Sequence, residues 1–229
     1  MAFNFVTFKT RALSAIVFVI VMLAGLLWNA WSFIILFTII HFGCWYEFVK
    51  LMIKIKPATY GYFLLAGLLY ITLPILLMID LRFSIFNKGI IPADFLLVIP
   101  CGIIFSIWIN DTMAYIVGSL IGKTPLSIIS PKKTWEGTIG GVILCIVAIS
   151  AIGWRSKLFT IKDWIMIGAI CAVFGTMGDL LQSKLKRMAN VKDSGSLMPG
   201  HGGFLDRFDS LLLATPFVWL YVYSFMYTF

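Results

Sequence analysis

Residues 12–46 read ALSAIVFVIVMLAGLLWNAWSFIILFTIIHFGCWY and contain no Asp, Glu, Lys or Arg. A helix needs roughly 20 predominantly apolar residues to cross the hydrocarbon core of a bilayer. This run is therefore long enough for two consecutive membrane spans, which we place at 12–27 and 31–49. A soluble domain would have no use for so long an apolar stretch near its beginning.

The rest of the chain continues this pattern. Hydrophobic residues make up 61% of the sequence and charged residues 12%, whereas soluble domains carry about 25% charged residues. Five further runs lack charged residues, at 57–79, 95–110, 137–154, 164–178 and 210–229. The runs at 95–110 and 164–178 reach spanning length only if an ionisable residue ends the helix, Asp94 or Asp111 in the first and Asp179 in the second.

These runs predict an all-α fold, a polytopic integral membrane protein with about seven to eight transmembrane helices. Five more helices follow the first two, at 58–79, 91–110, 137–154, 164–187 and 208–228. A further short helix at 111–122 would be the eighth. No repeat of 20 to 50 residues is visible, so we predict a single membrane domain over residues 1–229. Most acidic residues follow position 110, which predicts generic helices in 1–110 and a catalytic half in 111–229.

The net charge of +8 follows the rule that cytoplasmic loops of membrane proteins are rich in Lys and Arg, and we expect no nucleic-acid partner. The cations that place the N-terminus and the 50–56 loop in the cytoplasm are Lys9, Arg11, Lys50, Lys54 and Lys56. The loops at 123–136 and 183–207 lie on the same side if residues 111–122 do not cross the membrane by themselves.

The loop before the predicted helix at 137–154 reads GKTPLSIISPKKTWEG over residues 122–137. Hydroxyl groups, backbone N–H groups and Lys side chains suit phosphate, and the following helix would direct its N-terminal dipole toward an anion. The hydroxyl groups and Lys side chains of this loop, with the pair Lys132 and Lys133, are therefore candidates for phosphate binding. The alternative is a basic loop that touches only lipid head groups.

Asp179 ends a long apolar run, where a charged side chain costs about 2.5 kcal/mol or more unless it is paired, hydrated or bound to metal. On a continuing helix Asp179, Ser183 and Arg187 are spaced by four and share one face. This spacing fits a polar site, and a buried Asp–Arg ion pair is the alternative.

A glycine-rich segment with His201, Gly202 and Gly203 precedes two further carboxyl groups, Asp206 and Asp209. Glycine lets the backbone approach a ligand closely. Carboxyl groups that face one cavity repel each other, and a hard divalent cation such as Mg2+ relieves this repulsion. His201 is a candidate general base, with phosphate binding or fixing of the loop as alternatives.

Taken together, these motifs resemble the signature of the phosphatidate cytidylyltransferases, also called CDP-diacylglycerol synthases. The run from Ser183 to Asp209 follows the pattern S-x-x-K-R-x4-K-D-x-G-x3-P-G-H-G-G-x-x-D-R-x-D. Residues 111–123 and 129–137 are also similar to the upstream pattern of that family. The resemblance covers residues 111 to 209.

The resemblance implies a metal-dependent nucleotidyltransferase of phospholipid biosynthesis, which converts CTP and phosphatidic acid to CDP-diacylglycerol and pyrophosphate. The implied catalytic residues are Asp179, Asp206, Asp209, Lys186, Arg187 and His201. The implied phosphate ligands are Lys123, Ser130, Lys132, Lys133, Thr134, Ser183, Gly202, Gly203 and Arg207. The implied metal ligands are Asp179, Asp206, Asp209 and Asp111, for Mg2+ with a second cation as an open alternative.

The resemblance further implies membrane lipids as surroundings, a homodimer, and a location in the bacterial inner membrane with the active site facing the cytoplasm. Two other functions fit membrane architecture with these motifs. A CTP-dependent kinase acting on dolichol or phytol would transfer the γ-phosphate to a lipid alcohol. An ion-coupled transporter would use Asp179 as its ion site, but the sequence lacks the internal repeat common in such proteins.

Overall fold

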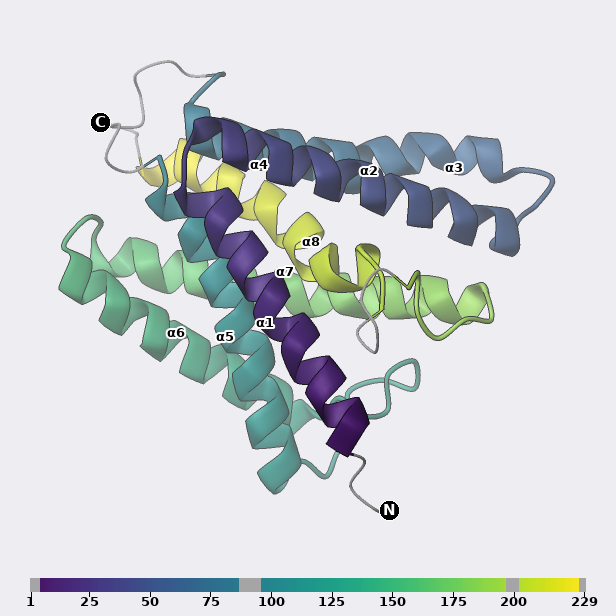
Figure 1. Ribbon diagram of the computed structural model, residues 1–229. Coiled ribbons are helices and arrows are strands. Elements are labelled where there is room, and N and C mark those ends of the chain that lie inside the picture. The colour runs from purple at the N-terminus through teal and green to yellow at the C-terminus, as the bar shows by residue number, and fades with distance from the viewer. Residues whose placement is uncertain (1–4, 87–95, 197–201, 227–229) are drawn as a thin grey trace. The chain divides into compact units, whose positions relative to one another are not determined.

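The computed structural model describes residues 5–86, 96–196 and 202–226, with side chains from Leu13 onward (Figure 1). Over these ranges the chain is helical, and the β-structure consists of one isolated bridge between Pro125 and Thr134. The elements are α1 (Phe5–Leu27), α2 (Ala30–Ile55), α3 (Tyr60–Gly67), η1 (Leu68–Thr72), α4 (Leu73–Phe83), α5 (Val98–Ile121), α6 (Trp135–Ser156), α7 (Ile161–Met188), α8 (Leu205–Tyr221) and η3 (Val222–Met226). The predicted all-α fold is confirmed.

Six helical segments among the described residues are long and apolar enough to cross a membrane. They are Ala30–Ile55, Tyr60–Phe83, Val98–Ile121, Trp135–Ser156, Ile161–Met188 and Leu205–Met226. The apolar part of α1, Leu13–Leu27, is shorter. The protein is therefore an integral membrane protein, and its helices follow the seven predicted segments.

The sequence suggested a separate eighth helix at 111–122, but residues 111–121 do not form one. They continue α5 without a break, and α5 ends where Gly122 takes an extended conformation. A carboxyl group at Asp111 does not interrupt the backbone hydrogen bonds of a helix, so the charge-based boundary at residue 110 was wrong. The predicted start of this helix at residue 91 lies outside the described residues.

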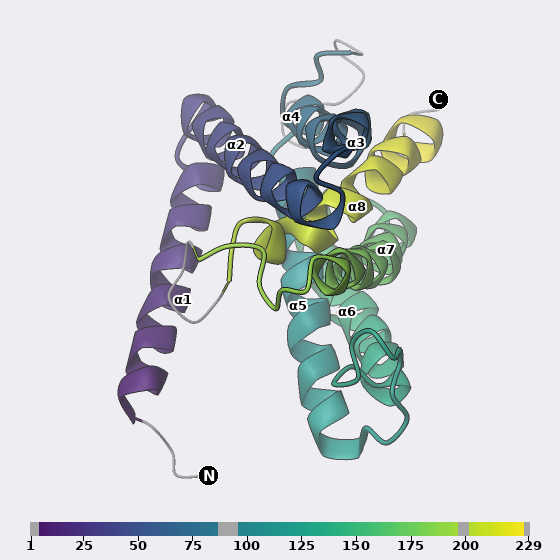
Figure 2. The ribbon, with the colours of Figure 1, turned by 90° about the vertical axis from the view of Figure 1, so that its right-hand side faces the viewer.

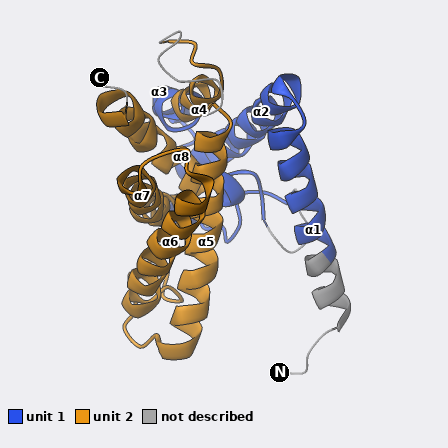
Figure 3. Ribbon diagram, turned by 90° about the vertical axis from the view of Figure 1, so that its left-hand side faces the viewer, with its two compact units in different colours: residues 1–72, 185–208 blue, residues 73–184, 209–229 orange. Residues whose placement is uncertain are grey.

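Contacts divide the chain into two compact units (Figure 3). Unit 1 contains residues 1–72 and 185–208, and unit 2 contains residues 73–184 and 209–229. Each unit is thus built from two stretches far apart in the sequence. This division does not coincide with the predicted change of character at residue 110, and the single domain stays a prediction.

In unit 1, α2 packs against α1, α3 and η1, and the views in Figures 1 and 2 agree on the sharp turn between α1 and α2. Asn29 ends this turn with a capping box: its side chain accepts from the backbone N–H of Ser32, and the Ser32 hydroxyl oxygen accepts from the backbone N–H of Asn29. Such a cap satisfies N–H groups that have no partner within the helix. The charge-free run 12–46 breaks into two helices at this cap.

In unit 2, α5 and α6 pack tightly along each other because small residues line their contact (Figure 2). A Cβ atom at Gly137 would lie 2.7 Å from the carbonyl oxygen of Ala114, and one at Gly141 would lie 2.7 Å from the Ala114 Cβ atom. Without a hydrophobic drive between helices in lipid, such small residues permit the close backbone contact that holds membrane helices together. This contact fixes the start of α6 beside the second half of α5.

Unit 2 also contains a fully buried carboxyl group, Asp80 of α4. Its Oδ1 accepts from the backbone N–H of Phe86 at 2.8 Å, and its Oδ2 accepts from Trp219 Nε1 and the Tyr223 hydroxyl, both at 2.7 Å. A buried polar group without partners would cost about 1–3 kcal/mol. The three donors therefore allow a carboxyl group within an apolar helix.

We expect Asp80→Asn to lower the melting temperature in detergent by the equivalent of about 1–3 kcal/mol, because either orientation of the amide turns its NH2 group toward a donor. Tyr223→Phe should cost less, since it removes one hydrogen bond and keeps the acceptor. Thermal unfolding of the purified variants measures both. An Asp80→Asn protein as stable as the wild type would contradict this role.

Candidate active site

The loop between α5 and α6, residues 122–134, is held in shape by hydrogen bonds across it. The Leu126 N–H donates to the Lys133 carbonyl oxygen at 2.7 Å, and the Trp135 N–H donates to the Thr124 carbonyl oxygen at 2.9 Å. Glu136, in the first turn of α6, accepts from the Thr124 hydroxyl at 2.8 Å and from the backbone N–H groups of Lys123 and Thr124. The loop is thus a folded structure rather than a loose basic segment.

A pocket of about 500 Å3 opens beside this loop in unit 2. Six of its lining residues belong to the sites predicted from the sequence: Asp111, Ser130, Lys132, Lys133, Thr134 and Asp179. The other lining residues are Asn110, Ala114, Tyr115, Gly118, Ser119, Thr138 and Thr176. Thr134 also caps α6, since its hydroxyl oxygen accepts from the Gly137 N–H at 3.1 Å. The pocket therefore combines two Lys residues, two carboxyl groups and hydroxyl groups beside a helix N-terminus.

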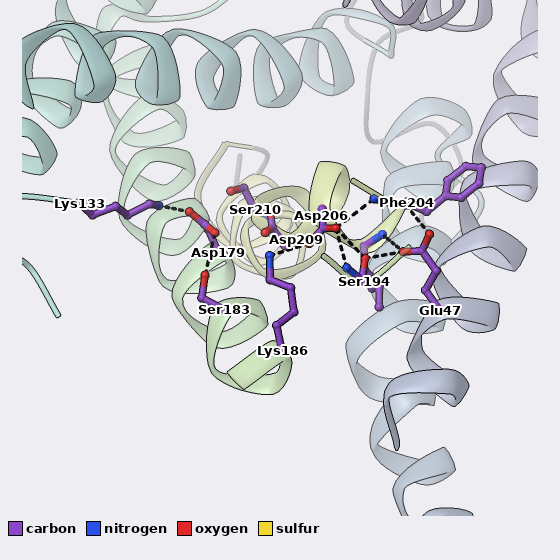
Figure 4. Close-up of polar contacts among 12 residues, drawn as sticks. Glu47, Lys133, Asp179, Ser183, Lys186, Ser194, Phe204, Asp206, Asp209 and Ser210 are labelled. Atoms are coloured by element: carbon purple, nitrogen blue, oxygen red, sulfur yellow. Dashed lines mark hydrogen bonds and ion pairs between the residues drawn. The ribbon is translucent and has the colours of Figure 1, made fainter. Parts of the chain in front are cut away.

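Lys133 and Asp179 form an ion pair in this pocket (Figure 4). Their side chains keep 30% and 28% of their surface exposed, so a ligand can reach both groups. The Ser183 hydroxyl donates to Asp179 Oδ1 at 3.4 Å, as expected for residues four apart on α7. The predicted helical face of Asp179 and Ser183 is confirmed, but the charge partner of Asp179 is Lys133 rather than the suggested Arg.

Asp209 lies near this group and is almost fully buried, with 6% of its surface exposed. It interacts electrostatically with Asp179, Asp111 and Lys133. Gly178 makes this arrangement possible, because a Cβ atom there would overlap the backbone carbonyl of Asp209. Unit 2 thus contains three of the four predicted metal ligands: Asp111 and Asp179 line the pocket, and Asp209 lies buried against Gly178, the neighbour of Asp179.

These residues fit a Mg2+ ion that is shared with a substrate. Over residues 5–86, 96–196 and 202–226, no three His, Cys, Asp or Glu side chains are close enough to enclose a metal by themselves. Mg2+ usually binds one or two carboxylates together with waters and substrate phosphates, and Asp111 and Asp179 line the same pocket. The buried Asn110 Oδ1 beside them has no hydrogen-bond partner within the described part of the chain.

Unit 1 holds the signature residues Lys186 and Asp206 (Figure 4). Lys186 Nζ lies 2.6 Å from Asp206 Oδ1, and both side chains are largely buried, with 15% and 8% exposed. Asp206 Oδ2 accepts from the backbone N–H groups of Ser194 and Gly203 at 2.8 and 3.0 Å. The conformation of Gly202 (φ 83°) brings the glycine-rich segment against Asp206, where a Cβ atom would lie 2.6 Å from Oδ2.

The remaining predicted residues are less closely tied to these groups. Lys123 is exposed and contributes its backbone N–H to Glu136. Arg187 and Arg207 are exposed, on α7 and α8 respectively. His201 lies outside the described residues. Their predicted roles in phosphate binding and catalysis stay predictions.

Comparison with known proteins identifies the family of the chain. The profile of the Cytidylyltransferase family matches residues 91–225, which include α5 to α8 and the whole pocket of unit 2. The chain belongs to this family. The resemblance noted from the sequence motifs is confirmed.

Three relatives of this cytidylyltransferase family member are named phosphatidate cytidylyltransferases. That of Staphylococcus haemolyticus is 45% identical over 113 residues, 48% of this chain and 43% of the relative. That of Staphylococcus saprophyticus is 46% identical over the same length. The chloroplastic phosphatidate cytidylyltransferase 4 of Arabidopsis thaliana is 47% identical over 123 residues, 52% of this chain and 30% of the relative. The chain thus matches less than half the length of each.

Sequence reasoning gave no role to three residues that the structure places at these sites. Asn110 lines the pocket, Glu136 binds the loop 122–134, and Glu47 accepts from the N–H groups of Phe204 and Leu205. Glu47 belongs to an apolar helix and gave no local signal. Asn110 stood next to the recognised Asp111 but carries no charge. Glu136 was quoted in a motif without a role, although an acid in the first turn of a helix often accepts from nearby N–H groups.

We expect Lys133→Gln to reduce kcat/KM for a nucleotide substrate by about 100-fold, the usual cost of removing one preorganised cationic or hydrogen-bonding group. Lys162→Gln is the matched control, because Lys162 is an exposed lysine on α7 outside the pocket. Steady-state kinetics on equal amounts of membrane-inserted protein measures both. Normal kinetics of Lys133→Gln would leave the loop as a topology signal only.

Proposed function

We propose that this protein is a phosphatidate cytidylyltransferase, which makes CDP-diacylglycerol and pyrophosphate from CTP and phosphatidic acid. The observation that carries the proposal is the pocket of unit 2, where Lys132, Lys133, Asp111 and Asp179 meet within the region matched by the Cytidylyltransferase family. The names of the relatives support the same reaction.

In this reaction a phosphate oxygen of the lipid attacks the α-phosphorus of CTP. A new P–O bond forms, the bond from the α-phosphorus to the oxygen bridging to the β-phosphate breaks, and pyrophosphate leaves with that electron pair. Both reactants are anions, so catalysis depends on groups that neutralise and align phosphoryl oxygens. The nucleophile comes from the substrate, and no covalent intermediate with the enzyme is needed.

Lys133 and the folded loop 122–134 are suited to the triphosphate. Without a ligand, Lys133 pairs with Asp179. A bound phosphate competes with Asp179 for Lys133, and the exposure of both side chains permits this exchange of partners. The hydroxyl groups of Ser130 and Thr134, together with the N-terminal end of α6, supply further favourable contacts for phosphoryl oxygens.

Asp111 and Asp179 would hold Mg2+ in the pocket, and Asp209 lies buried behind them, with its backbone against Gly178. A bound Mg2+ ion would neutralise phosphoryl oxygens and orient the triphosphate. Carboxyl groups in the pocket would otherwise repel the substrate.

The same proposal places the active site on the cytoplasmic side of a bacterial inner membrane. The loop 123–136 lies on the cytoplasmic side if residues 111–122 do not cross the membrane by themselves. Residues 111–121 continue α5, and a single crossing by α5 meets this condition. CTP is a cytoplasmic nucleotide, which agrees with that orientation. The homodimer favoured by the family resemblance is part of the proposal and is tested by the mass of the protein in nanodiscs.

The position of a radioactive label tests the reaction itself. With CTP labelled at the α-phosphorus and phosphatidic acid, label should appear in the lipid product, because the cytidylyl group is transferred. With CTP labelled at the γ-phosphorus, label should appear in pyrophosphate only. Label from the γ-position in a lipid would instead identify a CTP-dependent lipid kinase, and no transfer from either position would contradict both enzymes.

We expect activity to be lost after exhaustive treatment with EDTA and restored by Mg2+, because the pocket joins carboxyl groups with a triphosphate. Direct metal binding by calorimetry should weaken in Asp179→Asn, since the amide keeps an oxygen ligand but not the charge. Full activity of a protein shown by elemental analysis to contain no metal would refute the assignment.

A further inference from the structure

Glu47 is a buried acid in α2, in the part of the chain that carries no signature motif and lies before the matched family region. Only 4% of its surface is exposed. The pocket described above does not include it, and the proposed reaction leaves it without a role. A carboxyl group buried in an apolar helix is costly unless it is well partnered, so its partners indicate what it does.

Within the described residues, Glu47 accepts hydrogen bonds from the signature segment of unit 1 (Figure 4). Oε1 accepts from the Phe204 N–H at 2.9 Å, and Oε2 accepts from the Leu205 N–H at 3.0 Å and from the Ser194 hydroxyl at 2.6 Å. Leu205 is the first residue of α8. The Glu47 side chain, which comes from α2, therefore caps the N-terminus of α8. The helix dipole of α8 also stabilises a negative group at this position.

Small residues around Glu47 show that the segment is shaped to fit it. A Cβ atom at Gly195 or Gly203 would overlap the Glu47 carboxyl group. One turn earlier on α2, a Cβ atom at Gly43 would overlap the Phe204 ring. The backbone of the signature segment therefore packs directly against α2 at Gly195 and again at 203–204.

Ser194 links Glu47 to Asp206. Its hydroxyl oxygen lies 2.6 Å from Glu47 Oε2 and 3.0 Å from Asp206 Oδ2. A serine hydroxyl has one hydrogen, so it serves one carboxyl group at a time while its backbone N–H holds Asp206 at 2.8 Å. Asp206 in turn pairs with Lys186. Direct contacts therefore connect Glu47 through Ser194 to Asp206 and Lys186.

We propose that Glu47 is a positioning residue, which holds the described parts of the signature segment, at Ser194 and at 203–206, so that Asp206 and Lys186 keep the geometry needed for turnover. Its role is to fix the backbone of Phe204 and Leu205 and the side chain of Ser194. This inference rests on the proposed function for its kinetic test, and a second test does not require any activity.

Glu47→Gln is the informative variant, because the amide must turn its NH2 group toward at least one backbone N–H of the α8 start. Asp80→Asn is a matched control: Asp80 is also a buried acid of an apolar helix with three neutral donors, but it lies outside the proposed machinery. Both proteins are assayed as full chains in detergent, well below their melting temperatures.

For CDP-diacylglycerol formation, we expect Glu47→Gln to lower kcat about 10- to 100-fold, the range typical of residues that orient functional groups. The KM for CTP should change less than about twofold, since the pocket of unit 2 is untouched. Ser194→Ala should also lower kcat, whereas Ser194→Thr, which keeps the hydroxyl group, should have a kcat near that of the wild type. The double variant Glu47→Gln, Ser194→Ala should have a kcat only slightly below that of Glu47→Gln alone, because both changes remove the same interaction. Asp80→Asn should keep the wild-type kcat.

Hydrogen exchange tests the same role without substrate. Peptides that contain the amides of Ser194, Gly203, Phe204 and Leu205 should exchange faster in Glu47→Gln than in the wild type, and not in Asp80→Asn. Unchanged exchange there would overturn the proposal, as would a Glu47→Gln protein that loses stability but keeps kcat. The two tests can also give different answers. If the wild-type protein makes no CDP-diacylglycerol but Glu47→Gln still speeds exchange in these peptides, the positioning role is supported and the proposed reaction is refuted.

Discussion

The structure depends on how acidic side chains are satisfied within apolar helices. A carboxyl group in a lipid-facing or buried environment is costly unless donors or cations surround it. Three of the acids have such partners: Asp80 has three neutral donors, Glu47 has two backbone N–H groups and a hydroxyl, and Asp206 has Lys186 with two backbone N–H groups. The shape of the loops follows from this requirement as much as from helix packing.

The helices could be predicted from the sequence because a membrane span requires roughly 20 mostly apolar residues in succession. Long charge-free runs located the seven segments, but charged residues misled several of their ends: α1 begins at Phe5 rather than residue 12, α2 continues to Ile55 rather than ending at residue 49, and α5 runs on past Asp111. The pocket residues Lys132, Lys133 and Asp179 were also predictable. Their residue types suit phosphate and metal, and they lie close to the ends of spans, where polar groups can reach both water and the apolar phase.

Pairings between distant parts of the chain could not be predicted in this way. Lys133 pairs with Asp179, and Glu47 with Phe204, through packing that no local pattern records. Glu47 was the clearest case, because a single acid within an apolar run has the same appearance whether it faces a loop, water or another helix. The glycines at Gly178 and Gly203 became understandable only when their neighbours were known.

The contact between Glu47 and the start of α8 also has a consequence for biogenesis. Glu47 is synthesised 157 residues before Phe204, which at about 5–20 residues per second leaves an interval of roughly 8–30 s. During this time α2 enters the membrane without the N–H groups that will satisfy its acid. Lys50 and Lys54, one and two turns further along α2, keep this end of the helix near water. The contact between α2 and the start of α8 therefore forms only after residues 204 and 205 have been made.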